Sequence, residues 1–92
     1  MKIRVDYVAQ AKKITGMGSE HLSINDGTGI KELLSSVAQK HGPELISLVL
    51  SKDGSVQRSI IISINDEQVF AVDDQKLTEG DVIAIMPPMS GG

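Results

Sequence analysis

The feature that most limits how this chain can fold is a single amphipathic helix placed among segments with the periodicity of strands. Apolar residues between positions 30 and 41 recur at helical spacing and form one stripe, made of Ile30, Leu33, Leu34, Val37 and Ala38. A helix with one apolar stripe has one side to bury, so it must lie across one face of a sheet. Asp26 or Thr28 is placed to cap this helix, and Gly42 with Pro43 is placed to end it.

Segments with strand periodicity lie on both sides of this helix. The predicted strands, in chain order, are residues 2–8, 20–24, 60–64, 68–71 and 81–86. Residues 9–14 are predicted to form a short helical turn between the first two strands, ended by Gly16 and Gly18. Residues 44–50 fit either an additional helical turn or a strand, and residues 51–59 form a polar loop.

This element order, ββαβββ, predicts an α+β fold. We expect a mixed sheet of four to five strands with one main helix packed across one face, and with the first and last strands central and parallel. The arrangement is similar to the β-grasp, or ubiquitin-like, fold. The sequence therefore predicts a β-grasp domain over residues 1–86 and a flexible C-terminal Gly-Gly tail over residues 87–92.

The composition of the C-terminal tail favours a thin, extended segment. Its six residues are Pro87, Pro88, Met89, Ser90, Gly91 and Gly92. The two prolines lack backbone donors and so end strand pairing, which directs the chain away from the sheet. Glycine has no Cβ, so Gly91 and Gly92 fit a channel too narrow for other residues. Six extended residues span about 20 Å. We expect Ser90, Gly91 and the prolines to thread into a partner protein and the Gly92 carboxylate to be the reactive group.

Composition excludes several other classes of function. The chain has 12 acidic and 9 basic residues and a formal charge of −3, which argues against a nucleic-acid partner. No apolar run is long enough for a membrane span, and the N-terminal residues lack the pattern of a signal peptide, so we expect a cytoplasmic protein without a membrane partner. Cysteine is absent, and His21 and His41 have no partners at ligand spacing, so no metal site is predicted.

Beyond these patterns, the chain resembles the ubiquitin-like sulfur carriers. The resemblance extends over nearly the whole chain. It rests on residues 5–10, 12–16, 64–67, 77–82 and 86–92. Most specific is the ending Pro-Pro-x-Ser-Gly-Gly on a domain of this size. Within the family, the chain is more similar to the small subunits of molybdopterin synthase than to the thiamine-biosynthesis carriers.

The resemblance implies a covalent role for Gly92. In this family an ATP-dependent adenylating enzyme, similar to ubiquitin-activating enzymes, adenylates the terminal carboxylate. A sulfur donor such as a cysteine desulfurase or a rhodanese-like protein then converts it to a thiocarboxylate. The large subunit of molybdopterin synthase, which carries the catalytic residues, uses that sulfur to build molybdopterin, in a complex of two small and two large subunits. The chain alone would be no enzyme and would bind no cofactor, since ATP is used by the activating partner.

The resemblance also implies a surface that docks these partners, bordered by Met86, Val8 and Gln68. The chemistry fits this scheme, because a carboxylate with a pKa of about 3.5 is anionic at neutral pH and resists a sulfur nucleophile until it is activated.

Three alternatives stay open. The chain could carry sulfur for thiamine or another pathway, it could be a protein modifier joined through Gly92 to lysines, or it could be a noncovalent interaction domain.

Overall fold

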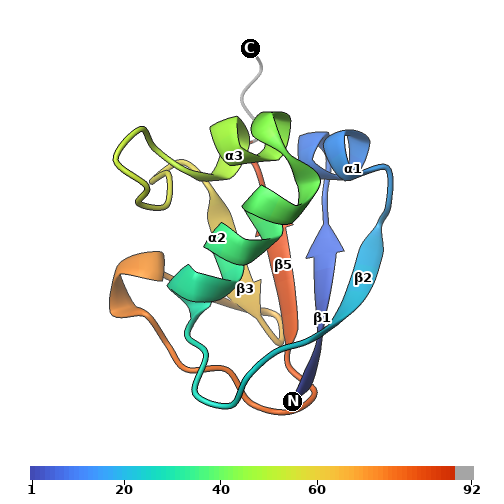
Figure 1. Cartoon of the computed structure of the whole chain (residues 1–92), viewed down its shortest axis with the longest axis vertical. Helices are drawn as coiled ribbons and strands as arrows, with labels where there is room; N and C mark the ends of the chain where they lie inside the picture. The colour runs from blue at the N-terminus through green and yellow to red at the C-terminus, as the bar shows by residue number, and fades with distance from the viewer. Residues whose placement is uncertain (89–92) are drawn as a thin grey trace.

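The computed structural model describes residues 1–88, in which helices cover one face of a five-stranded mixed sheet (Figure 1). In chain order the elements are β1 (Lys2–Tyr7), α1 (Gln10–Thr15), β2 (Ser19–Ser23), α2 (Ile30–His41), α3 (Pro43–Val49), β3 (Ile61–Ile64), β4 (Glu67–Val69), the 3-10 turn η1 (Ala71–Asp73) and β5 (Val82–Met86).

The strand order in the sheet is β2-β1-β5-β3-β4, and β1 and β5 are adjacent, central and parallel. All other neighbouring pairs are antiparallel. This topology confirms the predicted α+β, β-grasp fold with its two parallel central strands. Of the segment that the sequence left undecided, residues 44–50, all but Leu50 belong to the helix α3, which has Pro43 in its first turn, and Leu50 is its C-cap.

Alternation along the strands divides the sheet into a buried face and an open face. Ile83 and Ile85 of β5 point into the core, as do Ile3, Val5 and Tyr7 of β1. All five apolar residues of the predicted α2 stripe are buried against this face. Since burying each large aliphatic side chain contributes about 1.5–3 kcal/mol, this one layer supplies most of the apolar stabilisation. The opposite face of the sheet carries no helix among the described residues.

The predicted cap of α2 was wrong. Neither Asp26 nor Thr28 caps the helix, whose N-cap is Gly29. Instead, a carboxylate oxygen of Asp74 accepts a hydrogen bond from the backbone N–H of Lys31 at 3.1 Å. A Cβ on Gly29 would lie 2.5 Å from the same Asp74 oxygen, so the capping carboxylate needs glycine at this position. The cap comes from a segment 43 residues later, which local sequence patterns do not reveal.

Candidate functional site

Strand β5 determines where the C-terminal tail leaves the domain. It is held by β1 on one side and β3 on the other, with Ile85 paired to Tyr7 and to Ile62. The backbone N–H of Val8 donates to the Ile85 carbonyl at 3.2 Å, which continues the pairing to the end of the strand. A strand paired on both sides and filled with core residues is a rigid support, so the tail starts from a fixed point.

The start of β5 is fixed by a buried carboxylate. Asp81 accepts hydrogen bonds from the Thr78 backbone N–H at 2.8 Å and from the Asn65 side-chain amide at 2.9 Å. Asn65 in turn accepts from the Val82 backbone N–H at 2.9 Å. Burial alone would raise the pKa of Asp81, but the bonds from Thr78 and Asn65 outweigh it and lower that pKa. The turn after β3 and the turn before β5 are therefore joined.

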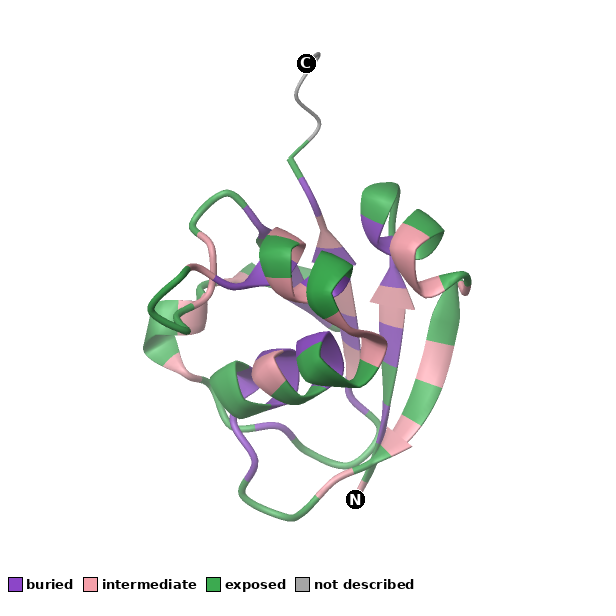
Figure 2. Cartoon of the chain, turned by 45° about the horizontal axis from the view of Figure 1, so that its top comes forward, coloured by how far each residue is buried: buried purple, intermediate pink, exposed green. Residues whose placement is uncertain are grey.

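The two prolines mark the change from domain to tail. Pro87 is buried and Pro88 is exposed, and Figure 2 shows the described chain changing from buried to exposed at this end. Since proline has no backbone N–H, strand pairing stops at Met86. The predicted threading residues Ser90 and Gly91 and the predicted reactive residue Gly92 lie outside the described residues, so these assignments stay predictions.

An apolar row crosses the open face of the sheet beside this exit point. The strand register pairs Ile61 with Met86, and Val8 and Phe70 each lie one residue beyond the paired residues of β1 and β4, in line with them. We call these four side chains the apolar row: Val8, Met86, Ile61 and Phe70. Val8 is 38% exposed, Ile61 37% and Phe70 61%, and Met86 is half-buried. Met86 shares its face of β5 with Val82 and Ala84. An exposed apolar row of this kind is typical of a surface that contacts another protein.

Gln68 lies one row further from the tail. The registers align it with Ser63 and Ala84, and Ala84 with Asp6, which forms a salt bridge with Arg4 at 2.9 Å. The structure therefore brings Val8 and Met86 together and places Gln68 on the same face, exposed but in a more polar row. Their contact with a partner stays a prediction.

Sequence reasoning missed two members of the apolar row, Ile61 and Phe70. The run of residues 60–64 suggested a strand apolar on both faces, because Ile60, Ile61 and Ile62 are consecutive. The alternation of side chains along a strand could have identified Ile61, since it places Ile61 on the same face of β3 as the polar residue Ser63. The position of Phe70 depends on the two-residue turn between β3 and β4, which sets the register of that hairpin.

A polar cluster on the helix-covered side joins three elements. The hydroxyl of Tyr7 donates to Glu20 Oε1 at 2.6 Å, and His41 Nε2 lies 2.9 Å from the same oxygen. Lys40 donates to the other carboxylate oxygen at 3.2 Å. Burial, reinforced by Glu20, raises the pKa of Tyr7. Burial opposes ionisation of Glu20, but bonds from Tyr7, His41 and Lys40 prevail and lower its pKa. This cluster ties β1 and β2 to the end of α2.

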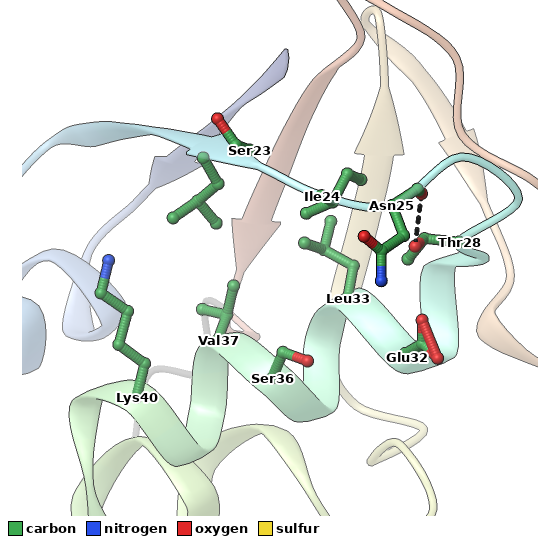
Figure 3. Close-up of a pocket in the computed structure, with 10 residues that line it drawn as sticks. Ser23, Ile24, Asn25, Thr28, Glu32, Leu33, Ser36, Val37 and Lys40 are labelled. Carbon is green, nitrogen blue, oxygen red and sulfur yellow. Dashed lines mark hydrogen bonds between the residues drawn. The ribbon is translucent and has the colours of Figure 1, made fainter. Parts of the chain in front are cut away.

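A groove of about 280 Å³ lies between β2 and α2 (Figure 3). Its apolar walls include Ile24, Leu33 and Val37, and it carries one acidic and one basic side chain, Glu32 and Lys40. None of the predicted site residues lines it. It is therefore separate from the surface around the tail.

Two further findings concern the described residues only. Within residues 1–88, no group of three or more His, Cys, Asp or Glu side chains is arranged to hold a metal ion. In the same residues, no helix has the length and apolar character needed to cross a membrane.

Comparison with known proteins gives consistent matches over the whole chain. The model of the ThiS family matches residues 5–92. The "Molybdopterin synthase sulfur carrier subunit" of Chlamydomonas reinhardtii is 32% identical over 92 residues, which cover all of both chains.

Two solved structures show the same fold. SAMP1 from Haloferax volcanii superposes with a TM-score of 0.89 at 23% identity, with both chains fully covered. A complex of subunits 1 and 2 of the molybdopterin-converting factor from Helicobacter pylori contains a chain that matches with a TM-score of 0.60 at 22% identity, again with full coverage. At these identities the structural likeness supports the fold.

Proposed function

Because this chain belongs to the ThiS family, we propose that it is a sulfur carrier, the small subunit of a molybdopterin synthase, and that its Gly92 carboxylate carries the sulfur. The family match and the full-length identity to a molybdopterin synthase sulfur carrier subunit support the assignment. The structural observation that carries it is the point where the chain leaves the sheet. The last central strand, β5, ends at Met86 and is followed by Pro87, next to an exposed apolar row. A partner that covers this row receives the tail at a fixed place.

The reactions at Gly92 need partners, because they require a leaving group that the carboxylate lacks. One carboxylate oxygen attacks the α-phosphate of ATP on an adenylating protein, and pyrophosphate leaves. The outer sulfur of a persulfide on a donor protein, such as a cysteine desulfurase or a rhodanese-like protein, then attacks the acyl carbon, and AMP leaves to give an acyl disulfide. A thiol attacks the donor's sulfur in this acyl disulfide, so that a disulfide forms and the thiocarboxylate is released. ATP is used by the activating partner, and this chain itself binds no cofactor. The chain is a covalent substrate in these steps, and the catalytic residues belong to its partners.

The apolar row is the surface that we assign to docking. Val8 and Met86 follow from the family resemblance, and Ile61 and Phe70 are added by the strand register. Partners that act on one carboxylate must approach the same exit point, so the adenylating protein and the large subunit share this surface in turn. The complex of two converting-factor subunits from Helicobacter pylori, whose matching chain has this fold, supports a large subunit as partner.

The proposal is tested by the intact mass of the chain after incubation with the adenylating protein, ATP and the sulfur donor. We expect an increase equal to the exchange of one oxygen atom for sulfur. A variant that lacks Gly92 is the matched control and stays unmodified. An unchanged mass, in a reaction that converts a known carrier, would refute the proposal. Isopeptide remnants of this chain on lysines of other proteins, without a thiocarboxylate, would instead support the protein-modifier alternative.

A further inference from the structure

A cleft of about 580 Å³ opens at the β4 end of the sheet, between the loop that follows α3 and the segment that follows β4. We call it the β4 cleft. Ile61 and Phe70, two members of the apolar row, also line this cleft. The apolar row and the β4 cleft therefore form one continuous surface, and a protein that covers the row reaches the cleft.

The β4 cleft is positively charged although the chain as a whole has a formal charge of −3. Lys31 and Arg58 line it, and none of its lining residues is acidic. Within residues 1–88 neither side chain forms a salt bridge. Asp74 contacts Lys31 through the backbone N–H and does not line the cleft. By contrast, the groove between β2 and α2 carries one charge of each sign. Two unpaired cations in one hollow are complementary to an acidic ligand.

The apolar part of the β4 cleft indicates a protein ligand and not a small anion. Phe70 is 61% exposed and Val72 77%, the two highest values among the large apolar side chains that are exposed in the described residues. A small anion would satisfy the two cations but would leave these side chains in water, whereas a polypeptide can cover both. Strand β4 is the edge strand on this side, and the outer backbone groups of an edge strand can pair with an extended segment.

We propose that the β4 cleft binds an acidic, extended segment of the large subunit of molybdopterin synthase, with carboxylates at Lys31 and Arg58 and an apolar side chain against Phe70 and Val72. This inference rests on the proposed function, which supplies the partner. It adds a second contact beside the tail, and this contact gives the complex an electrostatic component that the apolar row does not provide.

The test compares a variant of the cleft with a matched control. Lys31→Gln combined with Arg58→Gln removes two positive charges from the cleft, and Lys12→Gln combined with Lys13→Gln removes two exposed charges from α1. Affinity for the large subunit is measured by calorimetry at low and at physiological salt. We expect the cleft variant to bind about tenfold more weakly at low salt and to lose most of the salt dependence, and the control to stay within about twofold of wild type.

A second variant tests the apolar part. Val72→Ser should weaken binding at both salt concentrations, because its effect is not electrostatic. Since all the replaced side chains in the cleft variants are exposed, the thermal midpoint should be unchanged. Wild-type affinity of the double cleft variant, or an equal loss in the α1 control, would overturn the inference. So would a loss confined to the adenylation step, because it would assign the cleft to the activating partner.

The mass assay separates this inference from the proposed function. If the wild-type chain never gains sulfur, the proposed function fails. If it gains sulfur normally and the cleft variant still binds the large subunit as wild type does, only the role of the β4 cleft fails.

Discussion

The buried carboxylate of Glu20 gives the sharpest prediction about stability. Its side chain is 10% exposed, and it accepts hydrogen bonds from Tyr7 at 2.6 Å and from Lys40 at 3.2 Å, with His41 Nε2 at 2.9 Å. Replacement of Glu20 by alanine removes all three contacts together. It leaves the phenol of Tyr7, a buried side chain, without its carboxylate acceptor.

The magnitude follows from the burial of these groups. A hydrogen bond to a charged group contributes about 1.5–3 kcal/mol. The Tyr7 hydroxyl keeps a neighbour in the variant, His41 Nε2 at 3.3 Å, so no further cost is added for an unsatisfied hydroxyl. The Lys40 contact adds little, because that ammonium is 53% exposed. We therefore expect Glu20→Ala to lower the free energy of unfolding by about 2 kcal/mol, which corresponds to about 10 °C in the thermal midpoint of a domain of this size.

The assay is thermal unfolding followed by circular dichroism from pH 7 to pH 3, with Glu20→Gln as the charge-specific variant. The fold lowers the pKa of Glu20, so the stability from its ionised form is complete above the unfolded pKa and is lost as the pH falls through the lower folded value. The advantage of wild type over Glu20→Gln should therefore be constant near neutral pH and shrink below about pH 4.3. Glu67→Gln, at an exposed position in β4, is the control with no such advantage. An advantage that stays the same at pH 3, or that is equal for both variants, would contradict this reasoning.

Three further predictions concern the tail, the apolar row and the helix cap. Gly91→Leu should prevent thiocarboxylate formation in the mass assay while leaving the thermal midpoint unchanged, and normal sulfur transfer would argue against threading through a narrow channel. Phe70→Ser should weaken binding of the large subunit by about 1–2 kcal/mol in calorimetry with little change in folding, since the ring is 61% exposed; an unaltered dissociation constant would remove Phe70 from the docking surface. Gly29→Ala should destabilise the domain by about 1–2 kcal/mol in urea titration, because its Cβ would displace the Asp74 carboxylate. Asp74→Ala should lower the free energy of unfolding by about 1 kcal/mol. If the losses of the two single variants add in the double variant, the two effects are not coupled and this explanation of the cap is wrong.

The elements that the sequence predicted correctly are those set by local periodicity. The α2 stripe and the alternation in β1 and β5 need only the identity of nearby residues, and one helix with one stripe leaves few ways to arrange the sheet. The central, parallel pair of strands followed from that constraint and was confirmed.

The features that sequence did not reveal depend on contacts between distant segments. The cap of α2 by Asp74, the join of Asn65 to Asp81 and the cluster around Glu20 each connect residues at least 13 positions apart. Their residue types are ordinary surface types, and only the folded chain brings them together. Two members of the apolar row, Met86 and Val8, were named from the sequence, because the family resemblance implied them as docking residues. Its members on β3 and beyond β4 required the register.

The division of the sheet into two faces explains how a small domain can hold its own core and still offer an apolar surface. All helices of the described residues pack on one face, so core stability depends on Ile83 and Ile85 and not on Met86. Substitutions on the apolar row can therefore change binding without unfolding the protein. The same strand, β5, serves both faces and continues into the tail at Pro87. Under the proposed function, a partner seated on the apolar row meets the chain at the point where it leaves the core, at Pro87.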